Sequence, residues 1–380
     1  MCEGNIFEVL SQDIQIPEIV QNKANEAFRQ IRCEALQSRK EENENMSARA
    51  LFSNGKRRKL TIAILVAAMI LGTITVGAAV YKKWSQGIEE EFHVDEEKKQ
   101  FAEGSGVIDF PNLSVTDNGV TVTLKQSMAD DYFAFVSFKV EGFEIEKDMQ
   151  PGFGSTKAYI DGETIDSFSG FYDGIVTGPD GRGVLADGSE VPAENGRLIK
   201  DYRLEDGSLE CRIAMCQFRG EKGAFIGKTI HVEFEDLGIY PGKAEPIEKY
   251  IEGKWNFEWQ LGGSAESYAA ELNTELEDIG VIVKQIEISP MSMKAVLDFS
   301  RIGVNPPTLT GVKLKDGTMI PYLYLGPGFR GMKDGMYIDT FLVDRILDVD
   351  EIEAVLFRKD KLYDDEVPVE DRYYIVNIRP

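Results

Sequence analysis

The chain has 380 residues, 43% of them hydrophobic, and a formal net charge of −23. This length accommodates two or three domains, and the hydrophobic content excludes a chain that is disordered throughout. The acidic excess follows an apolar stretch at residues 60–80: residues 1–59 carry 10 Lys and Arg against 9 Asp and Glu, and residues 81–380 carry 32 against 56. Because nucleic acid requires positive charge, we expect no direct nucleic-acid partner.

The amino-terminal segment predicts a short α-helical region. Pro17 suits the first turn of a helix, and the apolar residues after it recur at spacings of three and four, on one helical face. These residues are Val20, Ala24, Ala27, Phe28, Ile31 and Ala35. So few large apolar side chains form little core alone. Either the helix packs on a short neighbouring segment, or another protein covers its apolar face.

Residues 60–80, LTIAILVAAMILGTITVGAAV, form an uncharged run of 21 residues. A helix of this length spans about 31 Å, which matches the hydrocarbon core of a bilayer at about 30 Å. Four basic residues precede it directly: Lys56, Arg57, Arg58 and Lys59. The positive-inside rule therefore predicts a single-pass cell-membrane protein, anchored by an uncleaved signal sequence, with a cytoplasmic amino terminus and an extracellular carboxyl-terminal region.

The charged segment SQGIEEEFHVDEEKKQFAEGS follows the apolar stretch and predicts a juxtamembrane linker with a helix and a Gly/Ser break. Tyr81 and Trp84 are placed to sit at the extracellular face of the bilayer. Further on, alternating runs rich in β-branched and aromatic residues predict half-buried antiparallel strands. Asp117-Asn118-Gly119 and Asp316-Gly317 are signals for tight hairpin turns. Residues 266–280 have little strand character and join two domains or form a short helix.

The sequence thus predicts a mainly β protein with five parts. These are a short cytoplasmic α-helical segment at residues 1–59, one transmembrane helix at 60–80, a charged juxtamembrane linker at 81–105, and two extracellular antiparallel β-sandwich (Ig-like) domains at 106–262 and 263–380.

Two patterns within the strands indicate core residues. Trp255, Phe257 and Trp259 alternate along one strand face, which is more typical of a sandwich core than of a sugar-stacking platform. Cys211 and Cys216 lie five apart on a strand and so point to opposite faces. We therefore expect buried free thiols rather than a disulfide.

No constellation of catalytic residues stands out. The chain has no nucleophile elbow and no phosphate-binding loop, and neither of its two histidines has an evident partner. We expect no enzyme activity, no metal and no cofactor. The 173–187 loop and the group Asp348, Asp350 and Glu351 offer oxygen ligands for calcium, but neither follows the twelve-residue calcium-loop pattern.

Several stretches resemble a family of membrane-anchored, anti-sigma-factor-like proteins of Gram-positive bacteria, which carry one domain of unknown function around the membrane span and often a second at the carboxyl end. The matching stretches are NIFEVLSQDIQIPEIVQNKANEAFRQIR, residues 56–80, DNGVTVTLKQSMADDYFAFVSFKVEG, GKWNFEW, ISPMSMKAVLDFS and LKDGTMIPYLY. The resemblance implies that the cytoplasmic segment sequesters an extracytoplasmic-function sigma factor and that the outer region receives a signal. Residues 1–59 contain no His, so any sequestration must use a metal-free helix, unlike that of zinc-type anti-sigma factors.

Two hypotheses follow. In the first, the amphipathic face that contains Phe28 binds a sigma factor in helix-in-groove fashion, the outer domains sense an extracellular signal, and proteolysis in residues 85–105 and then within the span releases the sigma factor. In the second, the protein is a surface-anchored binding or adhesion module, and its cytoplasmic tail only orients it in the bilayer.

Overall fold

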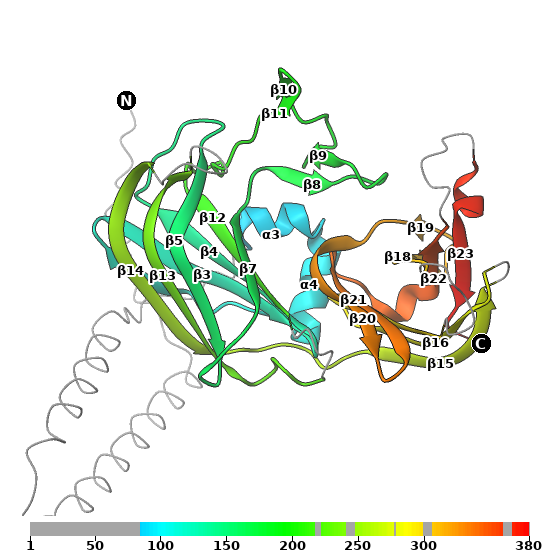
Figure 1. Cartoon of the computed structure of the whole chain (residues 1–380). Helices are drawn as coiled ribbons and strands as arrows, with labels where there is room; N and C mark the ends of the chain where they lie inside the picture. Colours follow the sequence, from blue (N-terminus) through cyan, green and yellow to red (C-terminus); the bar gives the residue numbers. More distant parts are fainter. Residues whose placement is uncertain are drawn as a thin grey trace, which may run out of the picture. The chain divides into compact units, whose positions relative to one another are not determined.

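The computed structural model describes residues 84–216, 222–240, 248–276, 279–298, 306–359 and 367–379, all within one compact unit of the chain (Figure 1). The predicted cytoplasmic helix, the predicted span at 60–80 and its basic flank lie outside the described residues. Within the described ranges, no helix is long and apolar enough to cross a bilayer.

The described part is mainly β, as predicted, and all its strand pairs are antiparallel. Two short helices precede the strands, and two 3₁₀ turns lie near the carboxyl end. Their bounds are α3 (Gln86–Glu91), α4 (Glu96–Ser105), η2 (Val349–Glu351) and η3 (Val369–Arg372).

Two sheets share the first hydrophobic core. The first has the order β1-β3-β4-β12-β7, with β2 also paired to β3, and the second has the order β14-β13-β5-β6. The strands of the first sheet are β1 (Ile108–Asp109), β2 (Leu113–Asp117), β3 (Val120–Ala129), β4 (Phe133–Glu141), β7 (Ser167–Phe171) and β12 (Leu209–Cys216). Those of the second are β5 (Gln150–Ile160), β6 (Glu163–Thr164), β13 (Thr229–Tyr240) and β14 (Glu248–Gln260).

The first core is rich in aromatic side chains. The predicted row Trp255, Phe257 and Trp259 is buried there, with exposed fractions of 0%, 2% and 7%. The hairpin turn predicted at Asp117-Asn118-Gly119 joins β2 to β3, and Gly119 has a φ of 82°, which suits glycine best. Alternation of apolar residues therefore identified this core correctly.

Two small hairpins extend from this region (Figure 1). They pair β8 (Ile175–Thr177) with β9 (Gly183–Leu185), and β10 (Ala193–Glu194) with β11 (Arg197–Leu198).

Two further sheets share a second core, which is mostly aliphatic. Their orders are β15-β16-β17-β21-β20 and β19-β18-β22-β23. The strands are β15 (Tyr268–Leu276), β16 (Val281–Ile288), β17 (Ser292–Asp298), β18 (Leu309–Leu314), β19 (Met319–Ile320), β20 (Tyr324–Lys333), β21 (Met336–Val343), β22 (Ile352–Arg358) and β23 (Tyr373–Asn377). The turn predicted at Asp316-Gly317 joins β18 to β19.

The expectation of a linker or short helix at 266–280 was wrong, because most of this stretch forms strand β15, paired to β16. Only Ala270 and Leu276 of β15 are buried. Tyr268 and Leu272 alternate with these two residues and pack partly buried against the second core, but the polar Thr274 interrupts the series and Ala270 is small, so the strand signal is weak.

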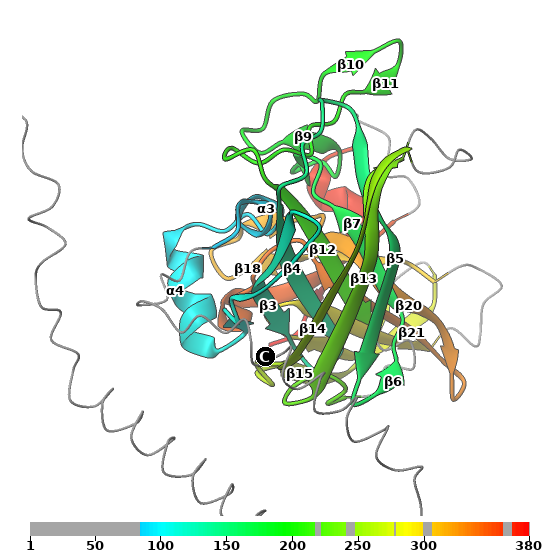
Figure 2. The ribbon, with the colours of Figure 1, turned by 90° about the vertical axis from the view of Figure 1, so that its left-hand side faces the viewer.

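A third hydrophobic cluster covers the outer face of the first sheet. Helices α3 and α4 contribute Ile88 and Ala102, and Phe92 directly follows α3. The first sheet contributes Phe133 and Phe135 among others. The part of the chain that forms the second core, called the second region, contributes Met291, Leu342 and Ile346. Figure 2 shows α3 and α4 on one side of the sheet that holds β3, β4 and β12. Because both faces of this sheet are covered, β12 is buried along almost its whole length.

The segment that was predicted to be a juxtamembrane linker differs from the expectation of a tryptophan at the bilayer interface. Trp84 is only 4% exposed, packs edge-on against Phe110, and its Nε1 donates a hydrogen bond to Glu103 at 3.2 Å. Trp84 thus packs in the third hydrophobic cluster of the protein itself, where it is shielded from the surroundings. The two cysteines of β12 behave as predicted: both are free and buried, Cys211 in the first core and Cys216 in the third cluster, on opposite faces of the strand.

Candidate functional site

Helix α3 is attached to the first sheet by a buried carboxylate, Glu210 of β12. Glu210 is 1% exposed and accepts hydrogen bonds from the backbone N–H of Gly87 at 2.8 Å, from Ser85 Oγ at 2.8 Å and from Ser137 Oγ at 2.7 Å. Burial raises the pKa of Glu210, and the hydrogen bonds from Ser137, Gly87 and Ser85 oppose that rise. The hydrogen bonds of an acidic side chain in the inner strand β12 are thereby satisfied in part by the start of a helix more than 100 residues earlier in the chain.

Gly87 permits this contact. A Cβ at position 87 would lie only 2.7–2.9 Å from the carboxyl atoms of Glu210, closer than real Cβ atoms approach other atoms. Only glycine lets the backbone of α3 approach the carboxylate this closely.

A second attachment lies at the other end of α3. Glu91 forms an ion pair with Arg212 of β12, and both side chains are mostly buried, at 12% and 17% exposure. The Arg212 guanidinium also lies over the ring of Tyr172, 5.1 Å from its centre, and the Tyr172 hydroxyl donates to Glu90. Burial raises the pKa of Glu91, and the charge of Arg212 opposes this. We call Glu210, Arg212 and Glu91 the α3 seat.

A groove of about 510 Å³ borders the α3 seat. Its walls come from α3, the outer face of the first sheet, and strands β20 and β21 of the second region. The lining residues that matter below are Glu91, Arg212, Phe135, Phe168, Tyr324 and Leu342. β7 and β20 are edge strands of their sheets, so the groove lies between two sheet edges with a buried ion pair beside it.

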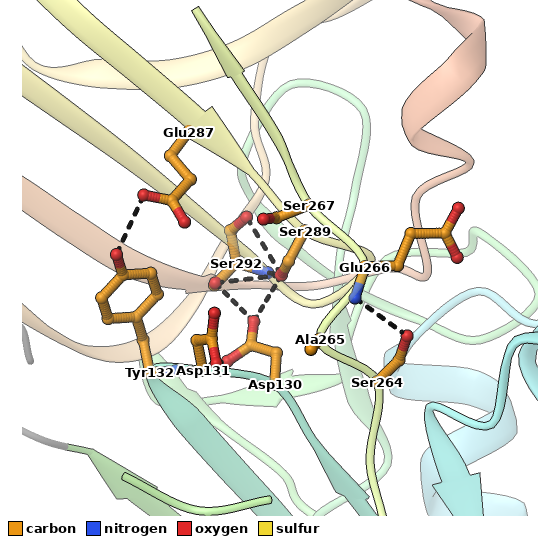
Figure 3. Close-up of a pocket in the computed structure, with 10 residues that line it drawn as sticks. All are labelled: Asp130, Asp131, Tyr132, Ser264, Ala265, Glu266, Ser267, Glu287, Ser289 and Ser292. Atoms are coloured by element: carbon orange, nitrogen blue, oxygen red, sulfur yellow. Dashed lines mark hydrogen bonds between the residues drawn. The ribbon is translucent and has the colours of Figure 1, made fainter. Parts of the chain in front are cut away.

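A different buried carboxylate joins the two β regions (Figure 3). Asp130, 1% exposed, accepts hydrogen bonds from the backbone N–H groups of Tyr132 and Phe133, each at 2.8 Å, and from the hydroxyls of Ser289 and Ser292. Burial raises the pKa of Asp130, and these hydrogen bonds oppose the rise. We call Asp130, Ser289 and Ser292 the Asp130 seam.

The neighbourhood of the seam is polar and closed. Tyr132 donates a hydrogen bond from its hydroxyl to Glu287 at 2.9 Å, and Lys222 lies 2.5 Å from the same carboxylate (Figure 3 shows the first contact). The hollow that Asp130, Tyr132 and Glu287 line leaves no room for a water molecule. Its chemistry is therefore that of a structural joint rather than of a ligand site.

Metal binding finds no support in the described ranges, where no three His, Cys, Asp or Glu side chains are grouped to hold an ion. The Asp348 carboxylate, one of the oxygen groups that the sequence offered as a calcium ligand, accepts the backbone N–H of Asp350 at 2.9 Å, and Asp350 lies 3.3 Å from Arg379. These contacts cap a 3₁₀ turn. The residues predicted to bind a partner or set membrane topology all lie outside the described residues.

Sequence reasoning missed Glu210, Arg212 and Asp130. Glu210 and Arg212 occur in LECRIAMC, where polar residues alternate with apolar ones and indicate a solvent-facing side. The Gly87 and Ser85 partners lie too far away in the sequence to form a motif. Ser85 and Gly87 occur in the stretch Trp-Ser-Gln-Gly, but no sequence rule relates this stretch to a distant strand, so the sequence held no usable signal for the contact.

The fold and site thus define a mainly β protein with a helical segment docked on its first sheet. Residues 53–142 match a family described as a domain of unknown function (DUF4179). That match runs from ahead of the predicted span, through α3 and α4, to β4. No curated protein matches the chain. Among solved structures, "The crystal structure of the conserved domain protein from Bacillus anthracis" is 15% identical, with a TM-score of 0.37, over 74% of this chain and 90% of that chain.

Proposed function

We propose that the protein is a single-pass membrane regulator of the anti-sigma-factor type, with two outer β-sandwich (Ig-like) domains. Its cytoplasmic segment holds an extracytoplasmic-function sigma factor, and its outer region controls release. The support from the sequence is the 60–80 apolar stretch with its basic flank Lys56–Lys59, which divides a nearly neutral segment from an acidic one.

One structural observation carries the proposal: the α3 seat. The first described residues after the apolar stretch are docked by a buried carboxylate and a buried ion pair rather than extended in solvent. A signal that changes the conformation of the first sheet would reach this segment through Glu210 and Arg212, because both residues lie on β12 of that sheet. Docking also restricts proteolysis of residues 85–105, because cleavage requires local unfolding. Release of α3 therefore provides a switch for the proposed proteolytic step.

The test is a pull-down of the full-length chain, in detergent, with the extracytoplasmic-function sigma factor encoded beside it. We expect the wild type to capture the sigma factor and Phe28→Asp to lose capture, because a charge then lies on the apolar face of the predicted helix. Asn25→Asp, which adds the same charge to the polar face, is the matched control and should bind normally. Absence of capture by the wild type, or equal capture by both variants, would reject the proposal.

The groove beside α3 favours a second candidate, a surface-anchored binding module. Here the outer region binds its ligand for adhesion and residues 1–59 are only a topological tail. This alternative expects that deletion of residues 1–50 leaves cell-surface binding intact and sigma-dependent transcription unchanged. Constitutive sigma-dependent transcription in that deletion strain supports the regulator instead.

A further inference from the structure

We propose that the groove beside α3 binds a small organic anion, an apolar or aromatic body that carries a carboxylate or phosphate, and that Arg212 holds the anionic group in place of Glu91. Ligand binding and the displacement of α3 follow from the groove itself; the consequence for sigma-factor release rests on the proposed function.

The groove has the size and lining of a ligand site. Its volume of about 510 Å³ lies within the range of about 300–1,000 Å³ of small-molecule pockets. Phe135, Ala214 and Leu342 give it an apolar lining, and two partly exposed aromatic side chains, Phe168 at 52% and Tyr324 at 49%, border it.

Two glycines keep the groove open. A Cβ added at Gly170 or at Gly326 would meet no atom of the described residues within 4 Å, so the described part of the chain leaves the space beside these positions open. The two glycines come from the edge strands β7 and β20. An aromatic or aliphatic ligand could therefore lie close to the backbone there.

Arg212 is the fixed charge of the site. It lies on β12, which is paired on one side to β4 and on the other to β7, whereas Glu91 is the last residue of a six-residue helix. A guanidinium forms two parallel hydrogen bonds with a carboxylate or phosphate, and such pairs are strongest where water is excluded. With 17% exposure, Arg212 is shielded yet accessible from the groove.

The same geometry disfavours a cationic ligand. A cation would have to displace Arg212 from Glu91 and leave the guanidinium buried on a strand that cannot move away, a costly arrangement. An anion displaces Glu91, which can leave with the end of α3 and become hydrated. A second cation, Arg330, lies near Tyr324 at 5.3 Å from its ring, and adds positive charge close to this border even though it is paired with Asp339.

Binding would therefore compete with one of the two attachments of α3. The ligand takes over Arg212 and Glu91 is freed, while α3 keeps its contacts around Glu210, the hydrogen bond from Tyr172 to Glu90 and the burial of Ile88 in the third cluster. The groove and the α3 seat would then form a coupled pair, in which ligand and docked helix exclude each other through one guanidinium.

The test uses full-length protein in lipid nanodiscs and titration calorimetry with three probes: 4-phenylbutyrate, 1-naphthyl phosphate and the neutral 4-phenylbutyramide. The two anions separate carboxylate from phosphate recognition. We expect Glu91→Gln, which removes the competitor, to bind at least one anion about tenfold more tightly than the wild type and about tenfold more tightly than it binds the amide. Amide exchange of residues 86–91 should accelerate when the anion binds the wild type.

Two variants keep the result decisive. Arg212→Gln combined with Glu91→Gln leaves neither member of the pair charged, so the fold persists and the preference for anions over the amide should disappear. Gly170→Leu places a side chain in the groove and should abolish binding of all three probes. Three outcomes would overturn the proposal. In two of them, Glu91→Gln binds no anion, or it binds anion and amide equally well. In the third, the double variant retains the preference for anions over the amide. Loss of sigma-factor capture with anion binding intact would reject only the proposed function.

Discussion

The α3 seat and the Asp130 seam each centre on a buried carboxylate that joins segments distant in sequence, but their surroundings differ. Asp130 is satisfied by neutral hydroxyl and backbone donors in a hollow without room for water. The α3 seat adds the Glu91–Arg212 ion pair and borders an open groove. A closed joint with neutral donors gives a ligand no access to the buried carboxylate, whereas an ion pair beside a groove can be reached by a ligand that competes for one of its charges. The seam therefore holds the two β regions together, and the seat is the joint that a ligand can open.

The largest change in stability is expected at the Asp130 seam. Asp130→Ala leaves two backbone N–H groups and two hydroxyls without their acceptor, and we expect the free energy of unfolding to fall by about 3–5 kcal/mol. Urea denaturation of the full-length protein measures this change. Asp131→Asn is the adjacent control and should change the free energy of unfolding by less than about 0.5 kcal/mol. A change of similar size in both variants would mean that Asp130 is not the centre of the joint.

The second prediction concerns the ion pair. Arg212→Gln leaves Glu91 mostly buried without its charge partner, so we expect a loss of about 3 kcal/mol. The Arg212→Gln, Glu91→Gln double variant should recover most of that loss, because neither charge is then unpaired. A double-mutant cycle by urea denaturation tests this. Additive losses would show that the two side chains act independently.

The third prediction uses two glycines in neighbouring helices. Gly87→Ala forces a methyl group against the Glu210 carboxylate and should destabilise the protein by about 1–3 kcal/mol, with faster amide exchange in α3. The methyl group of Gly104→Ala in α4 meets no atom of the described residues within 4 Å, so this substitution should stabilise the protein by about 0.5–1 kcal/mol through helix propensity. Stabilisation by both substitutions would contradict the close approach of α3 to Glu210.

The smallest effect is a pH dependence. Because the pKa of Glu210 is raised in the folded protein, the folded state binds this proton more tightly than the unfolded chain. The resulting stabilisation is complete below the ordinary pKa of about 4.5 and is lost as the pH rises through the higher pKa of the folded state. Relative to Glu210→Gln, the wild type should therefore lose stability with rising pH, which urea denaturation at a series of pH values measures. Glu205→Gln, at an exposed position, should track the wild type.

The sequence predicted those parts of the molecule whose signal is local. The alternation of Trp255, Phe257 and Trp259 is complete within five residues, and the turn preference of Asp316-Gly317 resides in two adjacent residues. The joints depend instead on pairs such as Gly87 and Glu210, whose role exists only once the sheet has formed. Buried carboxylates in particular resemble surface residues in a sequence, since their burial is stable only with partners that the fold supplies. For that reason the strand LECRIAMC was placed correctly while the meaning of its charged residues was missed.

The order of attachments along the chain has a mechanical consequence. Tension applied to the chain ahead of Trp84 first loads the contacts of Trp84, Ser85 and Gly87, which connect this segment to Glu103, to Gln126 of β3 and to Glu210 of β12. Each of these contacts is a single hydrogen bond, whereas β12 and β4 are joined by a continuous ladder of paired residues from Leu209 to Cys216. A pull on the chain would thus break the contacts of α3 before the strands separate, so that α3 detaches while the sheets remain folded.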